Sequence, residues 1–194
     1  MSAFSKFLDN RPKGSRKCKY DENQTPNIIK PKQNELYRFL LGRLDKDGKK
    51  PLVALCMNPS AANDKWSDAT VNIVIEASKE LGYSGWLVVN IYPEREPNQR
   101  KLGEFKDDLA KKNIKAIKDF LLERKITEVW GAWGDLKCKS LKRAKEMILE
   151  MLKEQKIKIF HFADTTKLGN PRHPNPRLLS MRPKVTKENK RYWS

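Results

Sequence analysis

The sequence lacks long apolar runs, and this excludes one large class of proteins. Its longest apolar runs, such as residues 85–92, are far too short to span a bilayer. No apolar stretch follows the basic residues near the N-terminus, so we expect no secretory signal. The sequence therefore predicts a soluble, cytoplasmic protein that has no membrane partner.

Cysteine and histidine are scarce and scattered. The three cysteines, Cys18, Cys56 and Cys138, stand far apart without C-x-x-C spacing. This argues against a disulfide framework and against a four-thiolate zinc or iron–sulfur site. The only two histidines, His161 and His173, are too few for a histidine-rich site. We therefore expect neither a metal nor another cofactor.

Acidic residues are outnumbered by basic ones. The chain of 194 residues has 24 Asp and Glu against 41 Lys and Arg, which gives a formal net charge of +17. In a small cytosolic protein such an excess most often serves a polyanionic partner, usually nucleic acid. A lysine-rich surface without any such partner is the alternative.

Hydrophobic periodicity divides the chain into three parts. Residues 1–33 are basic and show no periodicity, so we expect a flexible arm there. Residues 34–180 carry the periodic segments, and residues 181–194 are expected to form a basic C-terminal tail. Near the start of the central part, Leu36–Arg43 and Pro51–Met57 flank an Asp-Gly pair, which is typical of a β-hairpin. The length suits a single domain and, we expect, a monomer.

Within the central part, apolar strands alternate with amphipathic helices. The expected strands are apolar on both faces, as in a buried parallel sheet, and cover residues 52–57, 86–91, 128–133 and 157–162. The expected helices have apolar residues at helical spacing and cover residues 68–81, 107–124 and 140–153. This alternation predicts an α/β fold: a single three-layer domain with a mostly parallel four-stranded central sheet plus the N-terminal hairpin.

The loops after these strands carry the candidate functional residues, because open α/β sheets bind ligands beyond the carboxyl ends of their strands. These loops contain Asn58, Asn90, Trp133 and His173. No phosphate-cradling loop and no nucleophile elbow of a serine hydrolase is present. Each residue also has a structural interpretation, as a turn, a loop cap, a core residue or a solvated loop residue. Their common position at strand ends favours a functional role.

Several short motifs accompany these residues. They are Asn58-Pro59-Ser60, Asp68-Ala69-Thr70, Gly82–Asn90, Ala132-Trp133-Gly134 and Gly169–Pro174. As a set they resemble a bacterial, archaeal and phage family known only as a domain of unknown function. The resemblance covers about residues 35–180.

The order of the motifs is also similar to that of the uracil-DNA glycosylase superfamily. The resemblance implies that Asn58 positions the attacking water, as the Asn of the thymine and mismatch-specific branch does. It further implies that Asn90 reads a flipped base and that His173 stabilises the departing base anion. Met57 and Ser60 depart from the pattern of that superfamily, which argues against uracil as the substrate.

The resemblance thus implies a uracil-DNA-glycosylase-like fold and a monofunctional DNA glycosylase. Such an enzyme hydrolyses the N-glycosidic bond of a flipped modified base and leaves an abasic site. The link to phage suggests a hypermodified base, for instance glucosylated hydroxymethylcytosine, and a role in antiviral defence. The alternatives are a nucleotide- or nucleoside-processing enzyme on the same fold and a non-catalytic nucleic-acid-binding module. The basic charge disfavours the first, and the set of Asn58, Asn90 and His173 disfavours the second.

Further residues around this site have expected roles. Tyr92 and Trp133 are expected to recognise the base together with Asn90. Double-stranded DNA is the expected partner, and the residues expected to contact it are Ser60, Arg172, Asn175, Arg177, Lys184 and Lys187. Either Arg177 or Leu178 is expected to fill the gap that the flipped nucleotide leaves.

Overall fold

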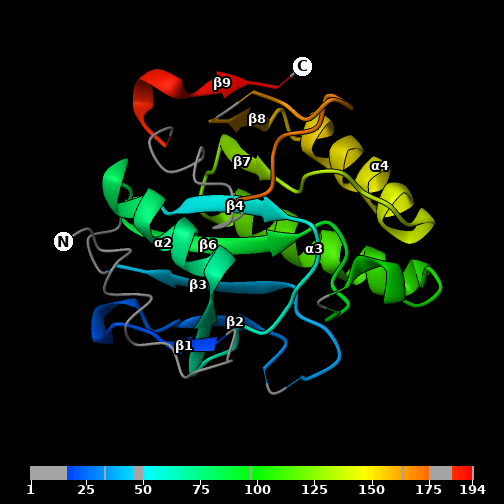
Figure 1. Ribbon diagram of the computed structural model, residues 1–194, viewed down its shortest axis with the longest axis horizontal. Coiled ribbons are helices and arrows are strands. Elements are labelled where there is room, and N and C mark those ends of the chain that lie inside the picture. Colours follow the sequence, from blue (N-terminus) through cyan, green and yellow to red (C-terminus); the bar gives the residue numbers. More distant parts are fainter. Residues whose placement is uncertain are drawn as a thin grey trace.

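A mixed β-sheet between helices forms the body of the protein, as the computed structural model in Figure 1 shows. The structure describes residues 17–32, 34–45, 50–96, 98–162, 164–174 and 185–193. Within these residues, seven strands form the main sheet in the order β2-β3-β6-β4-β7-β8-β9. Their bounds are β2 Ile28–Lys30, β3 Leu40–Leu44, β4 Leu52–Cys56, β6 Gly85–Asn90, β7 Glu128–Ala132, β8 Lys158–His161 and β9 Arg191–Tyr192. The predicted α/β class is confirmed.

The four predicted strands lie at the centre of this sheet. β4 is parallel to both β6 and β7, and β7 is parallel to β8. The sheet as a whole is mixed, because β3, β2 and β9 extend it with antiparallel pairings. β4 is the first of the four along the chain and lies between β6 and β7. The chain therefore continues on both sides of β4, which creates a topological switch point of the kind where ligands bind.

The predicted N-terminal hairpin does not form. β3 and β4 cover its two segments, but β6 lies between them: Leu87 of β6 pairs with Gly42 on one side and with Val53 on the other. All six residues of β6 are buried. A strand that is apolar on both faces is stabilised by neighbours at both edges, and this tertiary preference overrides the local turn signal.

Residues 17–32 belong to the folded body, although a flexible arm is expected over residues 1–33. β1 (Lys17–Lys19) pairs with β5 (Trp66–Asp68) in a second, two-stranded sheet, and β2 pairs with β3. A short 3₁₀ helix, η1, covers Glu22–Gln24. Strands of three residues are too short to show periodicity in the sequence. Residues 1–16 lie outside the described part of the chain.

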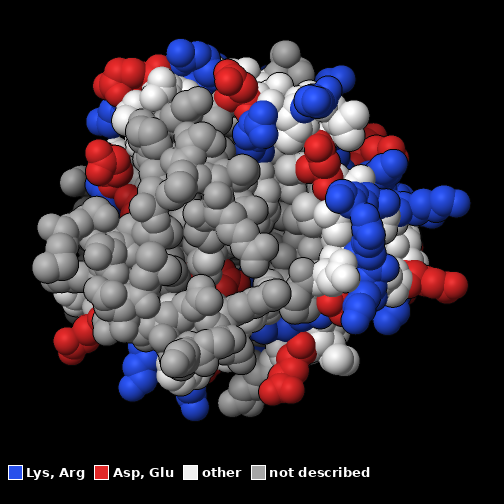
Figure 2. Space-filling model, in the orientation of Figure 1, with Lys and Arg blue, Asp and Glu red and all other residues white. Residues whose placement is uncertain are grey.

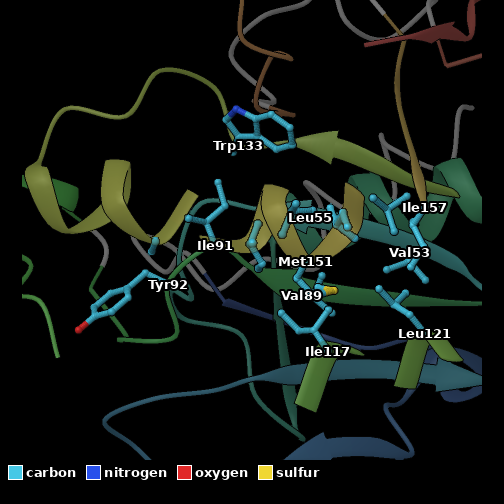
Figure 3. Close-up of a cluster of buried hydrophobic side chains, with 14 of the residues drawn as sticks. Val53, Leu55, Val89, Ile91, Tyr92, Ile117, Leu121, Trp133, Met151 and Ile157 are labelled. Carbon is cyan, nitrogen blue, oxygen red and sulfur yellow. The ribbon is translucent and has the colours of Figure 1, made fainter. Parts of the chain in front are cut away.

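The α-helices cover both faces of the sheet (Figure 1), and they are α2 (Ala69–Glu80), α3 (Asp107–Glu123) and α4 (Lys139–Glu154). Alternation along β4 assigns side chains to the two faces. Val53 and Leu55 pack in one core with α3 and α4, whereas Leu52, Ala54 and Cys56 pack in the other with α2. Figure 3 shows the first of these cores. Within the described part of the chain, no helix is both long and apolar enough to cross a membrane.

The turn after α4 places a non-glycine residue in the left-handed region of backbone conformation. Lys156 has a φ of 55°, and the N–H groups of Lys156 and Ile157 donate to the carbonyls of Lys153 and Leu152 at 3.0 and 2.9 Å. This is the Schellman pattern, and it starts β8 at a fixed angle to the helix. A side chain in this conformation costs about 1–2 kcal/mol.

We predict that Lys156→Gly raises the free energy of unfolding by about 0.5–1 kcal/mol. Glycine removes the cost of the left-handed conformation. It also raises the conformational entropy of the unfolded chain, which lowers the free energy of unfolding by about 0.4–1 kcal/mol. Lys153→Gly, inside α4, is the matched control and should lower the same free energy by about 1 kcal/mol. Urea unfolding measures both. A decrease of similar size in both variants would contradict the prediction.

Candidate functional site

The carboxyl ends of the three central strands lie level with one another. Cys56, the last residue of β4, pairs with Asn90 at the end of β6 and with Ala132 at the end of β7. The loops that carry Asn58 and Trp133 therefore begin side by side at one edge of the sheet. Three of the four strand ends that were expected to share one edge therefore do so.

Asn58 is tied to the backbone of the segment that follows β6. Its side-chain Nδ2 donates to the carbonyl of Glu96 at 2.6 Å, with longer contacts to the carbonyls of Glu94 at 3.4 Å and Pro59 at 3.3 Å. The N–H of Glu96 donates in return to the Pro59 carbonyl at 3.1 Å. Backbone carbonyls thus occupy the amide nitrogen of Asn58, and no hydrogen bond links its carbonyl oxygen Oδ1 to another described residue.

Charged side chains from other segments hold the rest of this loop. Arg95 Nη1 donates to the Ser60 carbonyl at 3.5 Å, and Arg38 Nη1 donates to the Ala62 carbonyl at 2.5 Å. The N–H of Ala62 donates to Asp68 Oδ2 at 3.3 Å. Side chains of opposite charge therefore hold the two polar groups of Ala62, and the loop conformation is fixed before any ligand binds.

Two of the charged residues that hold the loop, Arg38 and Asp68, are buried. Arg38 is only 2% exposed, and this burial lowers its pKa to about 10 while the charge of Asp68 acts to raise it. Asp68 also caps α2, because its Oδ1 accepts from the N–H of Val71 at 3.0 Å. Burial raises the pKa of the Cys56 thiol to about 12. Cys56 therefore stays protonated at neutral pH and is unsuited to act as a nucleophile.

No role was predicted for Arg38, Arg95 or Asp68. Asp68 stands in one of the family motifs, which was the available signal. Arg38 lies in the apolar segment that leads into β3, and a charged residue in such a segment is seldom buried without a partner. Arg95 follows the second strand end by only a few residues, among other polar residues, and its sequence context gives no distinct signal.

Asn90 is buried with an unsatisfied amide. Its side chain is 1% exposed, and its Nδ2 has no hydrogen-bond partner among the described residues. Its backbone carbonyl accepts from Asn113 Nδ2 at 2.8 Å, so α3 holds the end of the strand. A buried donor without a partner costs about 1–3 kcal/mol. An acceptor brought by a ligand would offset that cost.

Tyr92 and Trp133 are fully buried core residues, contrary to the expectation that they line a base pocket. The Tyr92 ring stacks on Phe105 with 5.7 Å between centroids, and its hydroxyl accepts from the N–H of Lys106 at 3.0 Å. Figure 3 places Tyr92 and Trp133 at different borders of the core. Because both side chains are fully buried, neither ring is available for stacking on a base.

Trp133 instead supports the loop that carries His173. Its Nε1 donates to Asn170 Oδ1 at 3.3 Å, and its ring meets Trp193 edge-on at 5.2 Å. Asn170 Nδ2 donates to Asp135 Oδ1 at 2.9 Å. Trp193 follows β9 and donates from Nε1 to the carbonyl of Gly169 at 2.8 Å. The end of β7 and the segment after β9 thus hold this loop from two sides.

His173 packs against the loop after β7. Gly134 has a φ of 67°, and a Cβ built on it would lie 3.1 Å from the His173 Cβ. The left-handed backbone conformation and this close contact both favour glycine at position 134. Burial lowers the pKa of His173, and the negative charge of Asp68 partly opposes this. The imidazole is therefore neutral at pH 7, with one nitrogen as a donor and the other as an acceptor.

The residues expected to contact DNA have mixed positions. Ser60 is half-buried in the Asn58 loop, and Arg172 lies beside His173 with its Nε bonded to the Asp164 carbonyl at 2.8 Å. Lys187 is exposed at the start of the short helix η4 (Lys187–Asn189), next to β9. Asn175, Arg177, Leu178 and Lys184 lie outside the described residues. Among those described, no group of three or more His, Cys, Asp or Glu side chains is placed to hold a metal ion.

We predict that stability falls as the pH decreases below about 6.5, in part because of His173. Since the folded-state pKa of His173 is lowered, the unfolded chain binds more protons between that pKa and about 6.5. The contribution is fully present above this window and is lost below it. Urea unfolding between about pH 5 and pH 7 should give a shallower slope for His173→Gln than for the wild type. Identical slopes would contradict the prediction.

Comparison with known proteins agrees with the family suggested by the motifs. A family model described as a protein of unknown function (DUF1643) matches residues 38–175, which include the loops of Asn58, Asn90 and His173. No match was found among curated proteins or among solved structures. The matched region covers well over half of the chain, from Arg38 to the residue after Pro174. The chain therefore belongs to the DUF1643 family.

Proposed function

We propose that the protein is a DNA glycosylase that hydrolyses the N-glycosidic bond of a flipped base. The observation that carries the proposal is the fixed Asn58 side chain, whose nitrogen donates to backbone carbonyls while its oxygen has no partner among the described residues and can accept from a water. Asn58 follows β4, whose end pairs with Asn90 of β6 and with the end of β7, where the loop of Trp133 begins. His173 packs against Gly134 of that loop. The motif resemblance to uracil-DNA glycosylases, and a fold of that kind, belong to the same proposal.

The chemistry explains why these residue types are needed. The bond breaks through an oxocarbenium-like sugar, while negative charge develops on the departing base. Water must therefore be held beside the sugar, and a donor must lie beside an oxygen of the base. Asn58 Oδ1 orients the water by accepting a hydrogen bond from it. A carboxamide is a poor base, so the enzyme depends on positioning more than on proton removal.

His173 supplies the donor for the departing base. A neutral imidazole has one N–H group that can donate a hydrogen bond to the base. Burial lowers the pKa of His173 and so keeps the imidazole neutral at pH 7. One such preorganised donor contributes about 3 kcal/mol to transition-state stabilisation. Gly134 and the Asn170 network fix the position of this loop, so little reorganisation is needed during the reaction.

Asn90 determines which base is accepted. Its unsatisfied Nδ2 is a donor that a carbonyl oxygen or ring nitrogen of the base can satisfy. The proposed substrate is a modified base in double-stranded DNA, with hypermodified cytosine of phage DNA as the leading candidate because the Asn58 loop differs from that of uracil enzymes. The protein would act as a cytoplasmic monomer without a metal or other cofactor.

We predict that Asn58→Ala lowers the single-turnover rate of base excision by about 10²-fold or more, because the attacking water loses its acceptor. Duplexes that carry uracil, a G·T mismatch, hydroxymethylcytosine or its glucosylated form serve as substrates, and alkaline cleavage reveals abasic sites. Asn27→Ala is the control, since Asn27 is exposed and its side chain bonds the Leu44 backbone, away from the candidate site. Equal rates in the two variants would place the chemistry elsewhere. Absence of excision on every duplex by the wild type would contradict the proposal itself.

A second prediction separates the position of His173 from general stability. Gly134→Ala and Gly82→Ala both force a side chain into the left-handed region, at φ values of 67° and 73°. Each should destabilise the fold by about 1–2 kcal/mol. Only the Cβ at position 134 would press on His173, because nothing lies within 4 Å of a Cβ at Gly82. Excision should therefore fall about 10-fold or more in Gly134→Ala alone. A similar loss in both variants would mean that destabilisation explains it.

A further inference from the structure

A short 3₁₀ helix, η2 (Gln99–Lys101), lies against the start of α4. The Gln99 side chain donates from Nε2 to the Asp135 carbonyl at 3.3 Å and accepts at Oε1 from the N–H of Lys137 at 2.8 Å. Ser140 in the first turn of α4 donates to the Gly103 carbonyl at 3.1 Å. These three hydrogen bonds join the segment after β6 to the segment after β7, at the carboxyl edge of the sheet.

This junction gathers cations on one surface. The five residues are exposed, and we call them the basic rim: Arg100, Lys101, Lys137, Lys139 and Lys142. None of their side chains forms an ion pair with a described residue. Figure 2 shows Lys and Arg gathered over this side of the molecule, around the N-terminal end of α4. Of the nearby carboxylates, Asp135 already accepts from Thr166 and Asn170.

The rim is electrostatically unfavourable in the free protein. α4 has no acidic residue in its first turn and instead begins with Lys139, and its N-cap Cys138 makes no side-chain hydrogen bond. A cation at the positive end of a helix dipole costs about 0.3–1 kcal/mol. In α3, by contrast, Asp107 and Asp108 occupy the first turn, and Asp107 pairs with Lys111 at 2.6 Å. An anion bound at the rim would offset this repulsion.

We propose that the basic rim binds the phosphate backbone of double-stranded DNA beside the flipped nucleotide. The inference rests on the proposed function and adds a contact surface to it. Asp135, whose carbonyl anchors η2, directly follows Gly134, which packs on His173, so the rim adjoins the candidate site. Five cations, on η2, on α4 and in the loop before α4, exceed what a single phosphate group needs. They suit the regularly spaced phosphates of a DNA strand.

The test compares two double variants of the full chain. Lys137→Ala with Lys139→Ala removes two rim charges. Lys153→Ala with Lys158→Ala removes two exposed charges near the opposite edge of the sheet and is the matched control. Each lost phosphate contact lowers the slope of log K against log salt by about 0.9, so the rim variant should lose about 1.8 in slope and about 10-fold in affinity near physiological salt. Fluorescence anisotropy with a labelled unmodified duplex measures both.

The outcomes separate this proposal from the glycosylase proposal. Weaker DNA binding by the rim variant than by the control variant, with a smaller salt dependence, supports the rim. If the wild type excises no base but the rim variant still binds DNA more weakly, the rim is supported and the glycosylase assignment fails. If the wild type excises a base and both double variants bind equally well, the rim proposal is overturned. Tighter binding of single-stranded RNA than of the duplex, lost in the rim variant, overturns the assignment to DNA.

Discussion

The loop that carries Asn58 depends on how the peptide groups of Ala62 are held. Its N–H donates to Asp68 and its carbonyl accepts from Arg38, so a buried anion and a buried cation fix the chain from both sides. Asp68 also caps α2, and its charge acts on His173. One carboxylate thus links a helix start, a loop and an imidazole. Without Asp68, Arg38 would still be buried but would have lost the negative charge that favours its charged form.

This arrangement leaves a few buried donors unpaired at the same edge of the sheet. Arg38 Nε and Asn90 Nδ2 have no hydrogen-bond partner among the described residues. Folded proteins satisfy nearly all such groups, and exceptions tend to lie at functional sites. The cost of the unpaired donors is offset by the apolar strands beneath them, since every residue of β4 and β6 is buried. A buried apolar core therefore supports a polar edge that contains unpaired donors.

The central strands and the helices were predictable from periodicity, because apolar residues on both faces of β4 and β6 have few alternatives to the middle of a sheet. Which strands pair with one another was less predictable. The Asp-Gly signal after β3 suggested a hairpin, but β6 lies between β3 and β4 and pairs with both. Strands of three residues, such as β1, carry no period to detect.

Within the candidate site, sequence position placed Asn58 and Asn90 at neighbouring strand ends, as the structure has them, but not the burial of the aromatic residues. Tyr92 and Trp133 stand just after strand ends, as a pocket wall would, yet both turn into the core. A single sequence does not distinguish these two directions once the strand alternation has ended. Arg38 acts on a loop 24 residues later in the chain, and only the folded structure brings the two together.

Trp193 has a consequence for the order in which the site is completed. It packs on Trp133 and donates to Gly169, so the loop of His173 depends on a residue 20 positions later in the sequence. The other strand ends of the site have emerged from the ribosome well before that residue is synthesised. A nascent chain can therefore form its central sheet while the histidine loop still lacks its last anchor. Because the chain is synthesised from its N-terminus, the site is complete only after β9 has joined the sheet.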